Sequence, residues 1–167
     1  MTLTPDIIEL ATEIIDTLRQ RGETLSTAES LTAGSLSSAI VTIAGASDVF
    51  VGGITAYRDE IKISHLHIDP MVIAKHTSMS EEVSVAMAQG ALKSFKTTWA
   101  IATTGVAGPN PVDGHPVGSV WVAIAGPVSQ TIELSLSGER ESVRNAATAS
   151  AIATFARILR HRSEKES

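Results

Sequence analysis

A serine hydroxyl lies in the segment from Ala28 to Gly34, where a predicted strand ends and a predicted helix begins. Free backbone N–H groups and the positive end of a helix dipole at such a junction favour an anion. The anion could be a phosphate or the oxyanion of a reacting carbonyl next to Ser30. Alternatively, Ser30 only caps the helix. The local sequence leaves both interpretations open.

A lysine follows the next predicted strand, with Lys62 five residues after Tyr57. This spacing lets both side chains face one cleft. A lysine that has lost its proton can act as general base for a serine, which is nucleophilic catalysis that needs neither His nor Cys. Lys62 is therefore a candidate base for Ser30. The alternative is a solvated lysine, as most lysines are.

Two further segments could bind an anion. The segment from Thr103 to Pro109 combines hydroxyls with glycines, so its backbone N–H groups could surround a phosphate, although it lacks the lysine of a Walker loop. Arg140 and Arg144 are four residues apart at a predicted helix start, which puts them on one face and suits phosphate recognition. The same arginines could instead pair with Glu139 or Glu141.

A metal or thiol centre is not expected. The chain has no cysteine, which excludes disulfides, a thiol nucleophile and Cys-ligated zinc or iron–sulfur sites. His65 and His67 are two residues apart, and no third ligand is near them in the sequence. The chemistry must use hydroxyl, amine, guanidinium or carboxylate groups.

The composition indicates one folded domain that binds neither nucleic acid nor a membrane. The chain has 167 residues, 43% of them hydrophobic, which supply a sizeable core. Its net charge is −5, whereas proteins that bind nucleic acid usually carry an excess of basic residues. The N-terminus has no signal-peptide pattern, and no apolar stretch reaches the ~20 residues that span a bilayer. We expect a single soluble, cytoplasmic domain over residues 1–167, with a polar tail from about residue 162.

Alternating helices and strands must position these side chains. Apolar periodicity and capping residues predict helices over 5–21, 30–43, 81–95 and 139–162, with a short one from residue 70. The predicted strands are 24–28, 49–57, 98–103, 118–125 and 130–136. Residues 105–116 carry too many prolines and glycines for regular structure, so we expect a long ordered loop there.

The order of these elements predicts an α/β fold. Helices alternate with strands over the first hundred residues, whereas Gly126-Pro127 separates the last two strands as a hairpin. We therefore predict a three-layer α/β/α sandwich with a mixed, mainly parallel sheet. Ligands in such folds bind beyond the carboxyl ends of the strands, where Ser30, Tyr57 and Thr104 are found.

Together, these motifs resemble the C-terminal domain family of the competence/damage-inducible protein CinA, whose stand-alone members include nicotinamide-nucleotide amidohydrolases. The resemblance covers nearly the whole chain. It is carried by five ordered segments, namely A-E-S-x-T-x-G at 28–34, Y-x-x-E-x-K at 57–62, T-G-x-A-G-P at 104–109, P-V-G-x-V at 116–120 and G-x-R-x-x-V-R at 138–144.

The resemblance implies hydrolysis of the carboxamide of nicotinamide mononucleotide to nicotinic acid mononucleotide and ammonia, without a metal or organic cofactor. Ser30 would be the nucleophile and Lys62 its base, while Tyr57 would position or polarise this pair. The residues assigned to the substrate are Glu29, Leu31, Thr32, Thr104, Gly105 and, for the phosphate, Arg140 or Arg144. A homodimer or higher homo-oligomer is implied as well. The alternative is a catalytically silent paralogue that binds the nucleotide without turnover.

Several residues depart from the pattern of this family. Leu31 stands where many members have Cys, Ala33 where many have Gly, and Arg58-Asp59 where many have Ser-Asn. None of these changes removes a proposed catalytic atom. The change at Arg58-Asp59 adds charge beside the cleft, so the substrate preference could differ.

Overall fold

Five strands form one mixed sheet in the computed structural model, which describes residues 4–166. They are β1 (Leu25–Glu29), β2 (Phe50–Thr55), β3 (Trp99–Gly105), β4 (Ser119–Ala125) and β5 (Gln130–Ser135). Their order in the sheet is β2-β1-β3-β4-β5. β1 pairs in parallel with β2 and β3, whereas β3 with β4 and β4 with β5 pair antiparallel. Only β4 runs against the others, so the predicted mixed sheet is confirmed.

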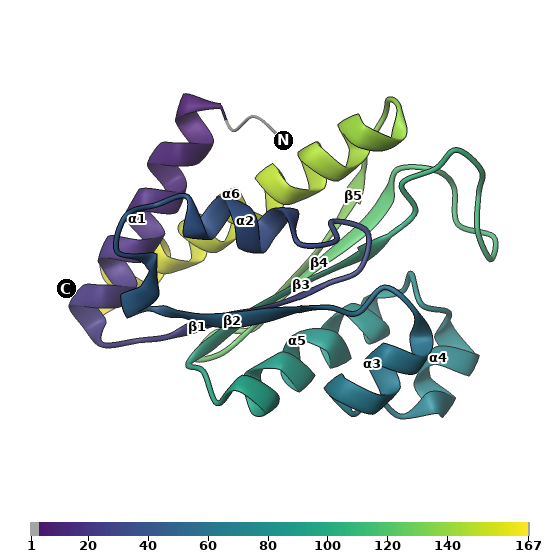
Figure 1. Ribbon diagram of the computed structural model, residues 1–167, viewed down its shortest axis with the longest axis horizontal. Coiled ribbons are helices and arrows are strands. Elements are labelled where there is room, and N and C mark those ends of the chain that lie inside the picture. Colours follow the sequence, from purple (N-terminus) through teal and green to yellow (C-terminus); the bar gives the residue numbers. More distant parts are fainter. Residues whose placement is uncertain (1–3, 167) are drawn as a thin grey trace.

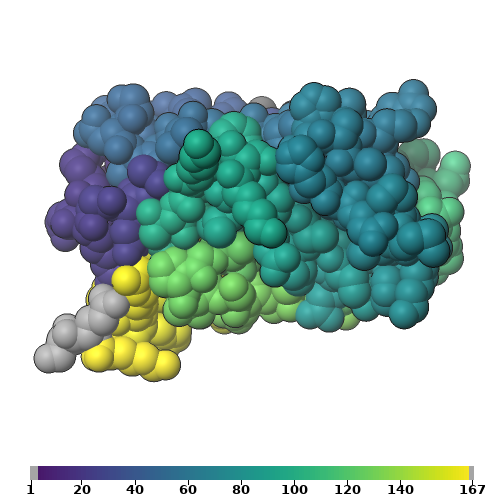
Figure 2. All heavy atoms as spheres, turned by 90° about the horizontal axis from the view of Figure 1, so that it is seen from below, coloured from purple at the N-terminus to yellow at the C-terminus, as the bar shows by residue number. Residues whose placement is uncertain are grey.

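Helices cover both faces of this sheet (Figure 1). One layer holds α1 (Pro5–Arg21), α2 (Ser35–Val41) and α6 (Arg140–Glu166), and the short 3-10 helix η1 (Ala46–Asp48) precedes β2. The other layer holds α3 (Asp59–Leu66), α4 (Pro70–His76) and α5 (Glu81–Phe95). Figure 2, seen from below, shows this second layer as a continuous teal surface. The predicted three-layer α/β/α sandwich is therefore confirmed.

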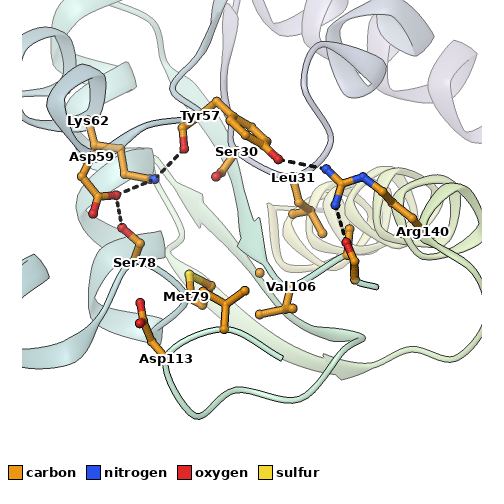
Figure 3. Close-up of a pocket in the computed structure, with 14 residues that line it drawn as sticks. Ser30, Leu31, Tyr57, Asp59, Lys62, Ser78, Met79, Val106, Asp113 and Arg140 are labelled. Atoms are coloured by element: carbon orange, nitrogen blue, oxygen red, sulfur yellow. Dashed lines mark hydrogen bonds and ion pairs between the residues drawn. The ribbon is translucent and has the colours of Figure 1, made fainter. Parts of the chain in front are cut away.

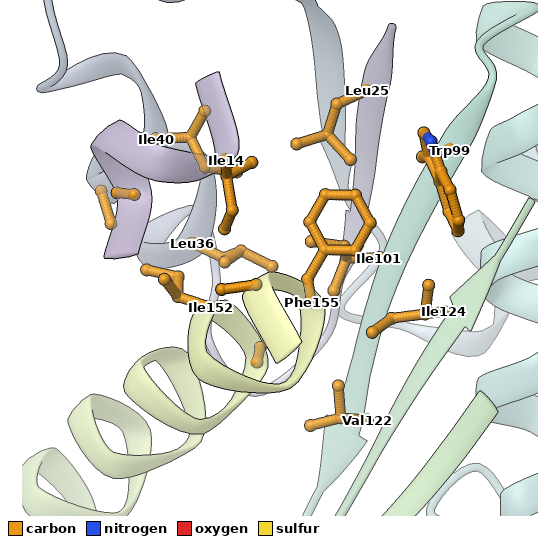
Figure 4. Close-up of a cluster of buried hydrophobic side chains, with 14 of the residues drawn as sticks. Ile14, Leu25, Leu36, Ile40, Trp99, Ile101, Val122, Ile124, Ile152 and Phe155 are labelled. Atoms are coloured by element: carbon orange, nitrogen blue, oxygen red, sulfur yellow. The ribbon is translucent and has the colours of Figure 1, made fainter. Parts of the chain in front are cut away.

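The two faces of the sheet carry side chains of different size. On β3, Trp99 and Ile101 point toward α1, α2 and α6, where Trp99 meets the Phe155 ring edge-on at 5.3 Å between centroids (Figure 4). Ala100 and Ala102 point the other way, into the cluster formed with α5. Because alanine side chains are short, α5 can pack close to the sheet. The segment that leads into α5 lies at the carboxyl end of β3, where the Thr104 hydroxyl donates to the carbonyl of Ser78.

Local signals predicted most helix ends correctly. α1 begins at Pro5 and ends before Gly22, which has the left-handed conformation typical of a helix C-terminus. The Asp69 carboxylate accepts a hydrogen bond from the main chain at the start of α4, and the Ser80 hydroxyl does the same at the start of α5. The predicted hairpin is present as β4 and β5.

The helix predicted over residues 30–43 is shorter, and this corrects the place given to Ser30. Residues 31–34 form a turn, and α2 begins at Ser35 with Gly34 as its N-cap. Glu29 explains the difference, because its carboxylate accepts hydrogen bonds from the main-chain N–H groups at the start of α2. Ser30 is therefore not the cap of this helix, and its hydroxyl is available for another role.

Two other elements differ from the expectation. Helix α3 was not predicted, because its short sequence has little apolar periodicity. Helix α6 continues through the expected polar tail at residue 162 to Glu166. Arg162 accounts for part of this extension, since its Nη1 donates to Glu23 at 2.6 Å and so holds α6 to the segment before β1.

Candidate active site

A cavity of about 270 Å³ opens at the carboxyl ends of β1, β2 and β3 (Figure 3). The chain leaves β1 for β2 on one side and later enters β3 on the other, so loops diverge at this edge of the sheet. The residues that line the cavity are Ser30, Leu31, Tyr57, Asp59, Lys62, Ser78, Met79, Gly105, Val106, Ala107, Gly108, Val112, Asp113 and Arg140. The predicted nucleophile, its predicted base and one of the two predicted phosphate-binding arginines are therefore together.

Ser30 directly follows β1 and is fixed by its main chain. Its N–H donates to the carbonyl of Thr103 at 2.9 Å, which ties the end of β1 to β3. The residue is buried, with 8% of its surface exposed, and its hydroxyl lies at the cavity wall (Figure 3). That hydroxyl makes no hydrogen bond to any other residue in the range 4–166. It is therefore free to meet a ligand.

Lys62 is the second chemically unusual group, because its side chain is only 1% exposed. Lysines are almost never buried to this degree without partners. Its Nζ donates to the main-chain carbonyl of Tyr57 at 3.3 Å and to Asp59 Oδ1 at 3.1 Å. No hydrogen bond joins Lys62 to Ser30. Catalytic hydrogen bonds are often formed only in the complex with substrate.

Asp59 and Ser78 extend this cluster, and the sequence pointed to neither as a site residue. The Ser78 hydroxyl donates to Asp59 Oδ1, the same oxygen that Lys62 contacts. Burial raises the pKa of Asp59, and the hydrogen bonds from Ser78 and Lys62 outweigh this, so its pKa lies below the ordinary value of 3.8. Asp59 is therefore an anion at neutral pH. In the sequence, the only indication that Asp59 belongs to the site was the extra charge that it places beside the cleft.

The turn after Ser30 presents two main-chain donors. Within residues 4–166, nothing accepts a hydrogen bond from the N–H groups of Leu31 and Thr32. Their carbonyls are held from behind by Arg144, whose Nε donates to Leu31 at 2.9 Å and whose Nη2 donates to Thr32 at 3.1 Å. Arg144 does not line the cavity. It fixes the turn that carries the two N–H groups.

Glu29 lies outside the cavity, although it was assigned to the substrate. Its buried carboxylate accepts hydrogen bonds from the N–H groups of Gly34, Leu36 and Ser37 and from the Ser37 hydroxyl. The anion-binding end of α2 is thus occupied by a side chain of the protein itself. Glu29 therefore stabilises the turn that follows Ser30.

Two more assigned residues, Thr104 and Thr32, also lie outside the cavity. The Thr104 hydroxyl is buried and donates to the carbonyl of Ser78 at 2.6 Å, so it holds the segment before α5 against β3. The Thr32 hydroxyl is buried against that of Thr103 at 2.7 Å. Neither side chain lines the cavity, whereas Gly105 does. A Cβ atom at Gly105 would collide with the main chain of Ser119, which explains the glycine there.

Arg140 and Tyr57 close the side of the cavity opposite Lys62 (Figure 3). Arg140 Nη2 donates to the phenolic oxygen of Tyr57 at 2.9 Å, and Nη1 donates to the carbonyl of Gly108 at 2.5 Å. The Tyr57 phenol therefore contacts Arg140, and Tyr57 reaches Lys62 only through its main-chain carbonyl. A direct catalytic role for the phenol stays a prediction.

The predicted long loop forms the remaining wall. Val112 pairs with His115 as an isolated β-bridge, and the His115 Nε2 lies 2.8 Å from the Thr77 hydroxyl, which anchors the loop to the segment between α4 and α5. Asp113 lies at the edge of the cavity, on the side of Ser78 (Figure 3). The sequence predicted the loop but did not single out Asp113.

Residues 4–166 offer neither a metal centre nor a membrane-spanning helix. No group of three or more His, Asp or Glu side chains in this range could hold a metal ion. Over the same residues, no helix has the combination of length and apolar character needed to cross a membrane. The cavity that contains Ser30 and Lys62 is the candidate active site.

Known proteins resemble this chain in sequence and in structure. Residues 7–159 match the family described as the CinA C-terminal domain. The chain is 38% identical to a CinA-like protein of Frankia casuarinae over 87% of its length, and 37% identical to one of Myxococcus xanthus over 80%. It spans 34% and 32% of those proteins, about a third of each.

Solved structures agree with this match. The crystal structure of the competence damage-inducible protein A (ComA) from Klebsiella pneumoniae has a TM-score of 0.90 and 32% identity, covering 93% of this chain and 98% of that one. The competence/damage inducible protein CihA from Agrobacterium tumefaciens has a TM-score of 0.87 and 32% identity, covering 93% and 97%. Both matches extend over nearly the whole fold described above.

Proposed function

The chain belongs to the CinA C-terminal domain family, and on this premise we propose that it is a nicotinamide-nucleotide amidohydrolase. It would convert nicotinamide mononucleotide and water into nicotinic acid mononucleotide and ammonia. One observation carries the proposal. Among residues 4–166, the hydroxyl of Ser30 has no hydrogen-bond partner, and it faces the same cavity as Lys62. The N–H groups of Leu31 and Thr32, which follow it in the chain, also have no acceptor among these residues.

In the first step, Ser30 Oγ attacks the carboxamide carbon of the substrate. A C–O bond forms, the carbonyl oxygen becomes an oxyanion, and the hydroxyl proton passes to Lys62 Nζ. The N–H groups of Leu31 and Thr32 donate to the oxyanion, and each such donor typically contributes ~3 kcal/mol. Arg144 supports this step from behind, because it holds the carbonyls of both residues.

In the second step, the tetrahedral intermediate loses ammonia. The C–N bond breaks while Lys62 returns its proton to the departing nitrogen, and an ester on Ser30 remains. Water then attacks the ester carbon and gives a proton to Lys62. Breakage of the ester C–O bond, with that proton returned to Ser30 Oγ, restores the enzyme and releases the carboxylic acid.

Ser30 suits the nucleophile better than the second serine in the cavity. The Ser78 hydroxyl is bound to the Asp59 carboxylate, whereas the Ser30 hydroxyl has no partner within residues 4–166. The free N–H groups also belong to the turn after Ser30. An oxyanion that forms on attack by Ser30 would be the acceptor that these two donors lack.

The phosphate of the substrate would bind between Arg140 and the loop after β3. A guanidinium has five N–H donors, and Arg140 uses one for Tyr57 and one for Gly108. The main-chain N–H groups of Ala107 and Gly108 also have no acceptor among the described residues. Of the two candidate arginines, Arg140 is favoured because it lines the cavity while Arg144 holds the Ser30 turn.

Ammonia release from the mononucleotide by the purified protein tests this function. Ser30→Ala should lower the rate by up to ~10⁶-fold, since loss of such a nucleophile can cost that much. Ser38→Ala on the exposed face of α2 is the matched control and should behave as the wild type. Substantial activity in the alanine variant at Ser30 would contradict the covalent mechanism. Saturable nucleotide binding without ammonia release by the wild type would favour the silent paralogue.

We also propose a homodimer or higher homo-oligomer. Val41 on α2 and Val51 on β2 are 55% and 54% exposed, on two elements that pack together at the edge of the sheet. A second copy could cover this apolar surface. Sedimentation equilibrium measures the mass in solution, and a monomer at high concentration would contradict the proposal.

A further inference from the structure

Given the proposed function, we propose that Asp59, held by Ser78, is a positioning residue that orients the amine of Lys62 and stabilises its protonated form. The three side chains form a continuous chain of contacts on one wall of the cavity (Figure 3). Ser78 donates to Asp59 Oδ1, and Lys62 Nζ donates to the same oxygen at 3.1 Å. The reaction itself requires only a base, so this arrangement is an additional feature of the site.

The number of hydrogen-bond donors on the lysine indicates what Asp59 does. A neutral amine has two N–H groups and one lone pair. The carbonyl of Tyr57 and the carboxylate of Asp59 are the two acceptors that Lys62 contacts. When both N–H groups are used in this way, the lone pair must point in the remaining direction. Asp59 thereby prevents the amine from rotating its lone pair away from the cavity.

Among the residues that the structure describes, Asp59 is the one charged group that contacts Lys62 Nζ. The other titratable groups lining the cavity are the phenol of Tyr57, the carboxylate of Asp113 and the guanidinium of Arg140, and none of them contacts Nζ. No titratable group on the neighbouring α4 and α5 contacts Nζ either. Glu81 binds Thr131, and Glu82 pairs with His76. Lys75 and Lys93 are exposed. The next carboxylate along α3, Glu60, is paired with Arg58.

This arrangement has opposite effects on two stages of the reaction. The Asp59 carboxylate stabilises the ammonium that Lys62 becomes when it takes the Ser30 proton, as the third group does in a nucleophile–base–orienter arrangement. The same charge makes the resting lysine harder to deprotonate. Asp59 should therefore raise the maximal rate and move the active pH range upward.

Asp59→Asn separates these effects, because it keeps the shape of the side chain and removes the charge. Removing the carboxylate that contacts Nζ should favour the neutral amine of Lys62 over the ammonium. Its titration can be followed by NMR of the side-chain nitrogen in protein labelled at lysine, assigned with Lys62→Arg. The ascending limb of kcat/KM for ammonia release should accordingly move to lower pH, and the maximal rate should fall roughly 10- to 100-fold.

Two further variants complete the test. Glu60→Gln removes the same charge from the adjacent position, where the carboxylate pairs with Arg58 instead of Lys62, and should leave the titration of Lys62 nearly unchanged. Ser78→Ala keeps the charge and removes the donor that orients it. It should lower the maximal rate several-fold while moving the titration less than Asp59→Asn does. This variant keeps the proposal testable if Asp59→Asn does not fold.

The outcomes distinguish this inference from the proposed function. An unchanged Lys62 titration in Asp59→Asn, a shift equal to that of Glu60→Gln, or a wild-type maximal rate in Ser78→Ala would overturn the role of Asp59. The NMR titration needs no substrate, so it decides the electrostatic part of the inference even without turnover. Failure of the wild type to release ammonia would overturn the proposed function alone.

Discussion

Arg140 Nη2 donates to the phenolic oxygen of Tyr57 at 2.9 Å and joins the first turn of α6 to the segment between β2 and α3 (Figure 3). The same guanidinium also holds the carbonyl of Gly108 on the loop after β3. Three separate parts of the chain therefore meet at one cation on the cavity wall. This cation is placed before any substrate arrives, which reduces the entropy lost on binding.

Arg140→Ala should weaken binding of the mononucleotide. Loss of a charge-assisted contact to the phosphate costs about 2 kcal/mol, which corresponds to a KM about 30-fold higher. Arg157→Ala, an exposed arginine on α6, is the matched control and should leave KM unchanged. Free nicotinamide lacks the phosphate, so the wild type should hydrolyse it far more slowly. Comparable kcat/KM values for the two substrates would refute the phosphate assignment.

Lys62→Arg should nearly abolish turnover. Arginine keeps the positive charge beside Asp59 but does not lose its proton at accessible pH, so it cannot take the proton of Ser30. The loss of general-base catalysis should lower kcat by ~10²- to 10⁴-fold. Lys93→Arg, on the exposed surface of α5, should have no effect on the same assay. If the arginine variant at position 62 remains active, Lys62 acts only as a fixed charge.

Glu29→Gln should destabilise the protein and the turn that carries Ser30. The buried carboxylate accepts hydrogen bonds from three N–H groups and one hydroxyl, and an amide would direct its own NH2 at these donors. We expect the free energy of unfolding to fall by about 2–4 kcal/mol. Urea denaturation measures this. Glu133→Gln on exposed β5 should change the value by less than about 0.5 kcal/mol, and an equal effect would contradict the structural role of Glu29.

Acid should weaken the contact between α1 and α6. The hydrogen bond from Arg160 lowers the pKa of Glu13 below its ordinary value of 4.5, although burial opposes this. Because the pKa is lower in the folded state, the pair stabilises the fold above pH 4.5 and this contribution is lost as the pH falls through the folded-state value. Both side chains are partly exposed, so Glu13→Gln should cost less than about 1 kcal/mol at neutral pH.

The test of this pH dependence is the difference in unfolding free energy between wild type and Glu13→Gln as a function of pH. The difference should shrink toward zero in acid. A difference that stays constant with pH would show that the effect does not come from the ionised pair. Asp6→Asn, at an exposed position on the same helix, serves as the control for removing an acidic charge from α1.

Most of the fold followed from local sequence. The starts of α1 at Pro5, α4 at Pro70 and α5 at Glu81, and the hairpin of β4 and β5, each depend on neighbouring residues, and all were predicted. The start of α2 was not, because Glu29 directs the chain there through hydrogen bonds to residues up to eight positions later. Propensity alone favoured a helix directly after Ser30.

The sequence by itself determined the order of helices and strands, the mixed sheet and the loops beyond the carboxyl ends of its strands. These properties depend on periodicity and caps within a few residues. Only the tertiary structure decided that Arg140 lines the cavity while Arg144 supports the turn at Leu31, and that Ser78 reaches Asp59. Arg144 and Leu31 are 113 residues apart, and partners at such distances are chosen by how the layers pack together. A sequence motif indicates which residue types belong to the site, whereas the packing of helices against the sheet determines which atoms each side chain contacts.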